Sequence, residues 1–305
     1  MKLNVWRFSD GLSGHDAQSN GLCLAIKEIV SIEQFDLDID TIKNCLKNLL
    51  LKKFPMGEDL PNPDIIIGAG HGTHLTMLTA RYIRKGKIIV LMKPSLPLNL
   101  FDICIIPKHD SPPKQKNVIE TTGALNSIEF NKHKQKNKGL ILIGGPSNHY
   151  QWSNKLIAQQ INEIISTHKE IDWTISNSRR TPKNMLPMIT SSTKKKYEIV
   201  NYNDSPKKNI KQLVFASETI WVTPDSVSMI FESLSSGALV GLFNLKEKKT
   251  TRITIQINNL VSNNNITTFG SWKKKNKLKN NNLELNEAHR CALVLQKKGL
   301  LNEKI

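Results

Sequence analysis

The sequence GLILIGGPS, at residues 139–147, decides the fold class of this chain. Its four consecutive apolar residues lead directly into two glycines. An uninterrupted apolar run of this kind is typical of a strand in a parallel sheet that helices cover on both faces. The sequence IIIGAGHG at residues 65–72 follows the same plan. The repeated pattern predicts a parallel α/β protein.

Strands and helices are expected to alternate on both sides of these two stretches. At residues 16–30, for example, Leu22, Ile26 and Ile29 recur at helical spacing and share one face. The expected strands are 1–8, 65–67, 87–92, 101–107, 139–143, 172–176, 217–222 and 239–244, and the expected helices are 16–30, 73–83, 155–166, 226–235 and about 283–298.

The polar, basic residues 132–138 divide this pattern and are expected to be a linker. A chain of 305 residues is long enough for two domains. We therefore expect two tandem Rossmann-like lobes, residues 1–138 and 139–305, with the helix at about 283–298 closing the second. Ligands of such sheets bind at the carboxyl ends of the strands, so the expected site is the cleft between the lobes.

The net charge of +17 indicates a polyanionic partner: a nucleic acid, an anionic membrane face or a diphosphate substrate. Part of the excess is in lysine-rich runs at 194–196, 246–249 and 273–282, which are typical of solvated loops. Aromatic residues make up only 6% and are not interleaved with these runs, so nucleic-acid binding is the least favoured class.

The four cysteines, at positions 23, 45, 104 and 291, form no CxxC pair and no zinc-like cluster. The first three lie among apolar residues, and we expect buried thiols in a reducing cytoplasm. We see no signal peptide, and no apolar run reaches the roughly 20 residues of a membrane span. Any membrane contact is therefore expected to be peripheral, at the cytoplasmic face.

Two candidate motifs follow strands of the first lobe. Asp10 and His15 flank a glycine-containing turn, where either side chain could act as a general base on an acceptor hydroxyl. The alternative is an Asx turn in which Asp10 caps the next helix.

Gly70, His71 and Thr73 belong to a glycine-rich turn that lacks the Walker lysine. The backbone amides of this turn could hold an anion or a polar acceptor group. The alternative is a tight strand-to-helix turn with no ligand and a solvent-facing histidine.

Two more candidate motifs follow strands of the second lobe. Gly144 and Gly145 would allow the backbone to approach a ligand closely, and Ser147 could cap the following helix. Ser178, Arg179 and Arg180 combine a hydroxyl with two guanidinium groups, which suits a diphosphate. The alternative for either arginine is an ion pair with an acidic neighbour.

The most informative motif is at residues 222–232. Thr223 ends a strand, and Asp225 or Ser226 is the expected N-cap of a helix that contains Ser228 and Glu232. A helix N-terminus favours phosphate, and an acid one to two turns into the helix can accept hydrogen bonds from ribose hydroxyls. The alternative is ordinary capping with an exposed glutamate.

These stretches together resemble the "elongated mitochondria" (mitochondrial fission) family, whose bacterial members are named as glycosyltransferases. The resemblance runs from Asp10 to about Leu242. One departure is Ser13, where the family pattern has a proline, and the Lys/Asn-rich segment matches nothing in the family. The matching stretches are 91–97, 101–110, 143–147, 178–182 and 222–237.

The resemblance implies a GT-B fold, similar in plan to the lipopolysaccharide heptosyltransferases, with the acceptor on the first lobe and a nucleotide-sugar on the second. It implies metal-independent transfer of a hexosyl or related group, with no cofactor beyond the donor substrate. Arg179 or Arg180 would neutralise the leaving diphosphate, and Glu232 would hold the ribose. Gly145, Ser147, Asp225, Ser226 and Ser228 would surround the phosphates and sugar, and Asp10 or His15 would be the base.

The favoured function is therefore a nucleotide-sugar-dependent glycosyltransferase that acts on a cell-envelope glycan or glycolipid of lipopolysaccharide type. A second hypothesis is a non-catalytic adaptor that retains the fold, because the eukaryotic branch of the family is associated with recruiting fission machinery.

Overall fold

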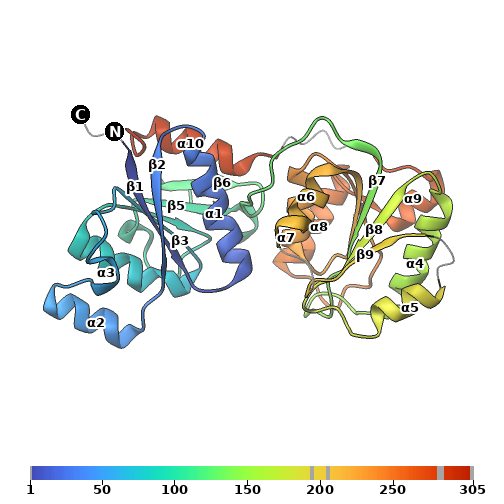
Figure 1. Ribbon diagram of the computed structural model, residues 1–305, viewed down its shortest axis with the longest axis horizontal. Helices are drawn as coiled ribbons and strands as arrows, with labels where there is room; N and C mark the ends of the chain where they lie inside the picture. Colours follow the sequence, from blue (N-terminus) through green and yellow to red (C-terminus); the bar gives the residue numbers. More distant parts are fainter. Residues whose placement is uncertain (1, 193–195, 204–206, 280–284, 303–305) are drawn as a thin grey trace. The chain divides into compact units, whose positions relative to one another are not determined.

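The computed structural model describes residues 2–192, 196–203, 207–279 and 285–302, and it divides into two compact units (Figure 1). Unit 1 comprises Met1–Ser127 and Asn286–Ile305, and unit 2 comprises Ile128–Leu285. Within the described residues, each unit contains one six-stranded sheet in which all neighbouring strands are parallel. The predicted fold class is confirmed.

The sheet of unit 1 has the strand order β2-β1-β3-β4-β5-β6. The central strands β3 and β4 are almost wholly buried, as their uninterrupted apolar sequences predict. The strands are β1 (Leu3–Ser9), β2 (Ile32–Asp38), β3 (Ile65–Ala69), β4 (Lys87–Leu91), β5 (Ile103–Pro107) and β6 (Val118–Thr121).

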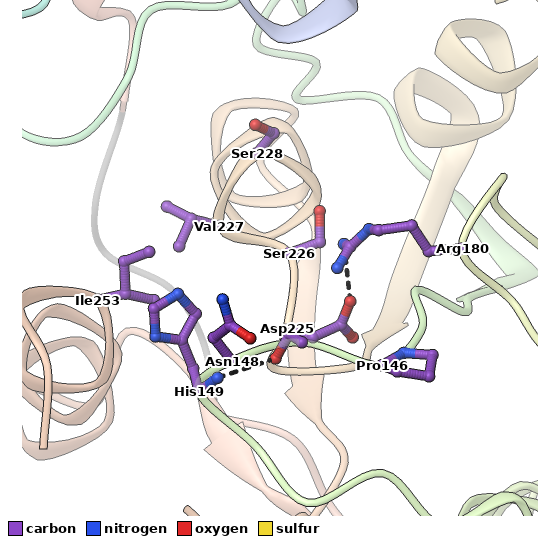
Figure 2. Close-up of a pocket in the computed structure, with 10 residues that line it drawn as sticks. Pro146, Asn148, His149, Arg180, Asp225, Ser226, Val227, Ser228 and Ile253 are labelled. Atoms are coloured by element: carbon purple, nitrogen blue, oxygen red, sulfur yellow. Dashed lines mark hydrogen bonds and ion pairs between the residues drawn. The ribbon is translucent and has the colours of Figure 1, made fainter. Parts of the chain in front are cut away.

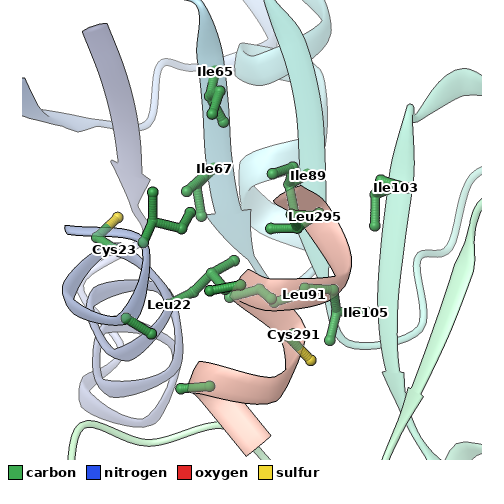
Figure 3. Close-up of a cluster of buried hydrophobic side chains, with 14 of the residues drawn as sticks. Leu22, Cys23, Ile65, Ile67, Ile89, Leu91, Ile103, Ile105, Cys291 and Leu295 are labelled. Atoms are coloured by element: carbon green, nitrogen blue, oxygen red, sulfur yellow. The ribbon is translucent and has the colours of Figure 1, made fainter. Parts of the chain in front are cut away.

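Alternate residues of these strands supply two separate hydrophobic cores, one on each face of the sheet. Ile65 and Ile67 point to one face and Ile66 to the other. Figure 3 shows the first core, where α1 and α10 cover the strands. The helices of unit 1 are α1 (Ser13–Lys27), α2 (Ile42–Leu51), α3 (His74–Arg84) and α10 (Glu287–Lys297), with short 3-10 turns at Pro55–Gly57, His71–Thr73, Leu98–Leu100 and Lys108–Asp110.

The predicted domain division differs from the structure in two respects. The boundary lies at 127/128 rather than 138/139, and the closing helix, expected in the second lobe, belongs to unit 1. Cys291 and Leu295 of α10 are fully buried in the core that α1 also covers. The sequence shows that α10 is amphipathic, but an apolar face alone does not say which sheet it covers. Residues 283 and 284 of the predicted helix lie outside the described residues.

The sheet of unit 2 has the strand order β12-β11-β10-β7-β8-β9. Its first strand begins inside the predicted linker, because the exposed residues 135–138 extend β7 and Gln135 pairs with Ser217. The strands are β7 (Gln135–Leu142), β8 (Asp172–Ser176), β9 (Glu198–Val200), β10 (Ser217–Val222), β11 (Leu239–Leu242) and β12 (Thr267–Thr268).

Helices also cover both faces of the second sheet. The core on one face contains Val214, Ile230 and Ile257, and the core on the other is built around Trp221 and Trp272. The helices are α4 (Asn154–Thr167), α5 (Met185–Ser192), α6 (Lys207–Ala216), α7 (Val227–Ser235), α8 (Arg252–Ser262) and α9 (Phe269–Lys275).

The lysine-rich runs have mixed outcomes. Lys273 to Lys275 form the last turn of α9 rather than a loop, whereas residues 246–249 lie outside the helices. Lys194, Lys195 and residues 280–282 lie outside the described residues. The predicted burial of the cysteines is confirmed, and all four are free thiols. Among the helices that the structure describes, none has the length and apolarity needed to cross a membrane.

Candidate functional site

A pocket of about 470 Å³ lies in unit 2, beside the carboxyl ends of β7 and β10 (Figure 2). This is the edge at which a parallel sheet offers backbone groups and helix N-termini to ligands. The lining residues are Pro146, Ser147, Asn148, His149, Arg180, Asp225, Ser226, Val227, Ser228 and Ile253.

The two glycines after β7 are required by what lies against them. A Cβ on Gly144 would come within 2.2 Å of the Asp225 carboxylate, and one on Gly145 within 2.0 Å of the Arg180 carbonyl oxygen. The amide of Gly144 donates to the hydroxyl of Thr223, and that of Gly145 to the carboxylate of Asp225. The glycines thus let the loop pack against the end of β10. In this structure they are packing residues, and they do not line the pocket.

Asp225 and Arg180 form an ion pair at the edge of the pocket, with Arg180 Nη2 2.7 Å from Asp225 Oδ2. The carboxylate is fully buried, whereas the arginine side chain is 46% exposed. Burial raises the pKa of Asp225, and the Gly145 hydrogen bond and the charge of Arg180 oppose that shift. Asp225 therefore holds the guanidinium at the pocket. Arg180 forms the ion pair that the sequence offered as an alternative, and its phosphate-binding role stays a prediction.

Arg179 and Ser178 have different positions from Arg180. Arg179 is exposed and does not line the pocket. Ser178 belongs to a turn in which its amide donates to the Thr181 hydroxyl oxygen. The single proton of that hydroxyl is shared between the carbonyl oxygens of Gly144 at 2.6 Å and Ile143 at 2.9 Å. This turn ties the end of β8 to the glycine loop and sets the position of Arg180.

Helix α7 begins at the pocket. Its N-cap is Ser226, whose side chain makes no capping hydrogen bond, and the first turn contains no acidic residue. The first backbone bond of the helix runs from the Ile230 amide to the Ser226 carbonyl, so the three amides before it have no acceptor within the helix. The pocket therefore meets the positive end of a helix dipole next to the Arg180 guanidinium.

Ser147 organises the opposite wall rather than capping α4, whose N-cap is Ser153. The Ser147 hydroxyl accepts hydrogen bonds from the amides of His149 and Tyr150, and its carbonyl oxygen accepts one from Lys248 Nζ at 2.7 Å. The His149 ring lies 3.1 Å from the Thr251 hydroxyl.

Glu232 lies in the second turn of α7 and does not line this pocket. Burial raises its pKa to about 7, and the charge of Lys211 opposes the shift.

In unit 1, the structure brings Asp10 and His15 together at the carboxyl end of β1. His15 Nδ1 lies 2.8 Å from Asp10 Oδ2, and the Asp10 and His15 side chains are 8% and 19% exposed. Asp10 Oδ1 accepts from the Leu12 amide, so the Asx turn offered as an alternative is also present. However, Asp10 does not cap α1, whose N-cap is Leu12. The two candidates for the base are thus a hydrogen-bonded pair.

The glycine-rich turn after β3 packs against this pair. Gly70 has φ +79°, and a Cβ there would come within 2.3 Å of the His15 ring. Thr73 is fully buried and donates to the Gly70 carbonyl, which leaves its hydroxyl no room for a ligand. His71 is exposed. The turn positions His15, and only His71 of its three predicted residues offers a side chain to solvent.

Five residues that line the pocket are not among the predicted site residues: Pro146, Asn148, His149, Val227 and Ile253. His149 follows the glycine loop directly, and its position there was a usable signal. Ile253 comes from α8, more than a hundred residues after the loop, and only the fold brings it to the pocket. Among the described residues, no group of three His, Cys, Asp or Glu side chains could hold a metal ion.

The family model "Mitochondrial fission ELM1" matches residues 13–298 of the sequence. The chain belongs to this family. One relative is a Rickettsia prowazekii (strain Madrid E) protein named "Uncharacterized protein RP120", which is 26% identical over 96% of this chain and 98% of its own length. The predicted family membership is confirmed.

Solved structures with the same fold include nucleotide-sugar enzymes. The UDP-GlcNAc 2-epimerase of Methanocaldococcus jannaschii is similar with a TM-score of 0.60 and 14% identity, over 97% of this chain and 100% of that one. A Neisseria meningitidis UDP-GlcNAc 2-epimerase bound to UDP-GlcNAc is similar with a TM-score of 0.55 and 12% identity, over 99% of this chain and 100% of that one. Acinetobacter baumannii MurG is similar with a TM-score of 0.50 and 11% identity, over 98% of this chain and 92% of that one. This chain therefore has the GT-B fold that such epimerases and glycosyltransferases share.

Proposed function

We propose that this protein is a nucleotide-sugar-dependent glycosyltransferase that acts on a cell-envelope glycan or glycolipid. The observation that carries the proposal is the Arg180 guanidinium, which Asp225 holds beside the first-turn amides of α7, which have no acceptor within the helix. A guanidinium and a helix N-terminus are both favourable partners of phosphate oxygens, and here they share one pocket. The GT-B fold supports a donor of the nucleotide-sugar class.

The diphosphate would bind between Arg180 and the first turn of α7, where the Ser226 and Ser228 side chains line the pocket. Arg180 and the α7 amides would stabilise the negative charge that develops on the leaving diphosphate. The nucleoside would lie towards His149, Val227 and Ile253, the apolar and aromatic part of the lining. The ribose contact expected of Glu232 stays a prediction, because Glu232 lies one turn further along α7 from Ser228 and does not line the pocket.

His15 is the proposed general base, with Asp10 as its positioning residue. A hydrogen bond from Nδ1–H to Asp10 would leave the Nε2 lone pair free to take a proton. His15 would remove the proton of the acceptor hydroxyl, whose oxygen bonds to the anomeric carbon of the donor. The bond from that carbon to the diphosphate then breaks, and the nucleoside diphosphate leaves with the electron pair. The cleft between the two units that this scheme requires stays a prediction, as does the cytoplasmic, membrane-peripheral location.

Isothermal titration calorimetry of the full chain with UDP-, GDP-, ADP- and CMP-sugars tests the proposal. We expect binding of at least one diphosphate donor and weaker binding of the monophosphate CMP-sugar. The Arg180→Ala variant should lose this binding, while Arg179→Ala, a matched change at the exposed neighbour, should keep most of it. A folded protein that binds none of the four donors would contradict the proposal and favour the adaptor hypothesis.

A further inference from the structure

Helix α2 of unit 1 turns an apolar row outward instead of burying it. Ile42, Leu46 and Leu50 recur at every fourth position and are 70%, 58% and 84% exposed. The inward side of the helix is formed by Cys45 and Asn48, and α2 packs on α3. Surface helices of globular proteins normally have the reverse arrangement, with the apolar stripe facing the core. In Figure 1, α2 lies at the outer edge of its unit, beyond α3.

Basic side chains border this apolar row. At 100° per residue, Lys43 and Lys47 form a second row directly beside Leu46 and Leu50. Lys52 and Lys53 follow at the end of the helix, and all four lysines are exposed. The helix itself contains no acidic residue. Asp40 precedes it, and the Asp40 carboxylate is already engaged by Asn44 and Asn48.

We propose that α2 is a docking element for an anionic lipid bilayer, with the Ile42–Leu46–Leu50 row entering the headgroup region and the adjacent lysines contacting anionic headgroups. An exposed leucine row next to a lysine row is the composition of helices that lie in the plane of a membrane interface. The charge of the segment selects a negatively charged surface rather than a neutral one.

The packing of α2 fits this role. Its inner side is anchored by the buried Cys45, which lies 3.7 Å from the Thr76 hydroxyl of α3, and by Asn48. The helix also has a Thr41 N-cap that accepts from the Asn44 amide and a left-handed C-cap at Lys52. The row is therefore displayed on a preformed helix, so docking would not require the helix to fold on the membrane.

Vesicle co-sedimentation of the full chain tests the proposal, using phosphatidylcholine vesicles with and without phosphatidylglycerol. We expect binding to the anionic vesicles only, and weaker binding as salt rises. The double variant Leu46→Gln/Leu50→Gln keeps good helix formers and should bind at least about tenfold more weakly. Lys43→Gln/Lys47→Gln should lose about fivefold per lysine at low salt.

Matched controls separate α2 from the rest of the surface. Leu24→Gln/Ile255→Gln alters two other exposed apolar residues, and Lys136→Gln/Lys155→Gln alters two other exposed lysines. Neither control should change vesicle binding. The proposal is overturned if the wild-type chain does not bind anionic vesicles, or if the controls lose as much binding as the α2 variants. Donor binding by calorimetry, which α2 variants should leave unchanged, reports on the proposed function separately.

Discussion

The guanidinium of Arg180 is held 2.7 Å from Asp225, a carboxylate with no solvent exposure at the edge of the pocket in unit 2. Arg180 comes from the turn after β8 and Asp225 from the loop after β10, and the glycine loop after β7 lies against both. The ends of β7, β8 and β10 are therefore in contact around the Arg180 guanidinium.

The first prediction concerns Arg180→Ala. Hydrogen bonds to charged groups are worth about 1.5–3 kcal/mol, so donor affinity should fall by roughly ten- to a hundredfold. Because the change leaves the fully buried Asp225 carboxylate without its cation, the free energy of unfolding should also fall, by about 1–3 kcal/mol. Calorimetry and urea denaturation measure the two effects. If Arg179→Ala weakens binding as much as Arg180→Ala, the pocket does not hold the diphosphate as proposed.

The second prediction concerns Gly145→Ala. Its Cβ would meet the Arg180 backbone at 2.0 Å, so the loop must shift, at a cost of about 1–3 kcal/mol in the free energy of unfolding. Gly14→Ala is the matched control, because Gly14 lies inside α1 with nothing within 4 Å of the added Cβ. That control should be neutral or stabilising by up to about 1 kcal/mol. Equal destabilisation of both variants would contradict the packing role of Gly145.

The third prediction separates catalysis from donor binding. His15→Gln removes the proposed base, and turnover should fall by about 10²–10⁴-fold while donor affinity, which depends on unit 2, stays the same. Asp10→Asn should also lower kcat, because it removes the carboxylate that keeps the proton on Nδ1 and leaves Nε2 as the base. The exposed His71→Gln is the control and should retain most activity. Loss of donor binding in His15→Gln would argue against a role as base.

The fourth prediction is a pH dependence caused by Glu232. Burial raises its folded pKa to about 7 from an ordinary value of 4.5, so between these values the folded state holds more protons than the unfolded state. The free energy of unfolding should therefore fall as pH rises from about 4.5 to 7. Glu232→Gln should remove this slope. The free energy of unfolding of the variant minus that of wild type should therefore be larger at pH 8 than at pH 5, by about 1–3 kcal/mol.

Chemical denaturation at pH 5 and pH 8 measures this difference. Glu198→Gln, at an exposed position on β9, is the control and should change stability by the same amount at both pH values. A Glu232→Gln variant with the wild-type slope would show that another group causes it.

The fifth prediction tests the assignment of α10 to unit 1. Leu295→Ala removes a fully buried side chain from the core beneath α1 and should cost about 2–5 kcal/mol in the stability of unit 1. Leu293→Ala, on the same helix at a position 38% exposed, should cost much less. Differential scanning calorimetry should show a lower unfolding temperature for unit 1 and an unchanged one for unit 2.

Much of the fold could be predicted because buried parallel strands have a clear sequence pattern. The ranges of β8 and β10 match the predicted 172–176 and 217–222. The strands β2, β6, β9 and β12 lie at or near sheet edges, and each is short or partly exposed, so the apolar run that identifies a central strand is missing. Helix α2 was missed for a related reason: its apolar residues do not face the core.

The site could be predicted only in part. Of the predicted residues, Arg180, Ser226 and Ser228 line the pocket, because the ends of β8 and β10 bring them to one edge of the sheet. The sequence could not show that Asp225 fixes Arg180 and binds the Gly145 amide, since these contacts join residues 45 and 80 positions apart in the chain. The pairing of Asp10 with His15 was also unforeseen, although the two lie five residues apart.

The return of α10 to unit 1 has a consequence for synthesis on the ribosome. Unit 2 is one continuous segment, so all of its strands are available to fold once residue 285 has emerged. The sheet of unit 1 is made first, yet part of one face stays uncovered until residues 287–297 have been translated. The amino-terminal half of the protein is therefore the last to be completed, and until then the apolar residues that α10 covers stay exposed and prone to aggregation.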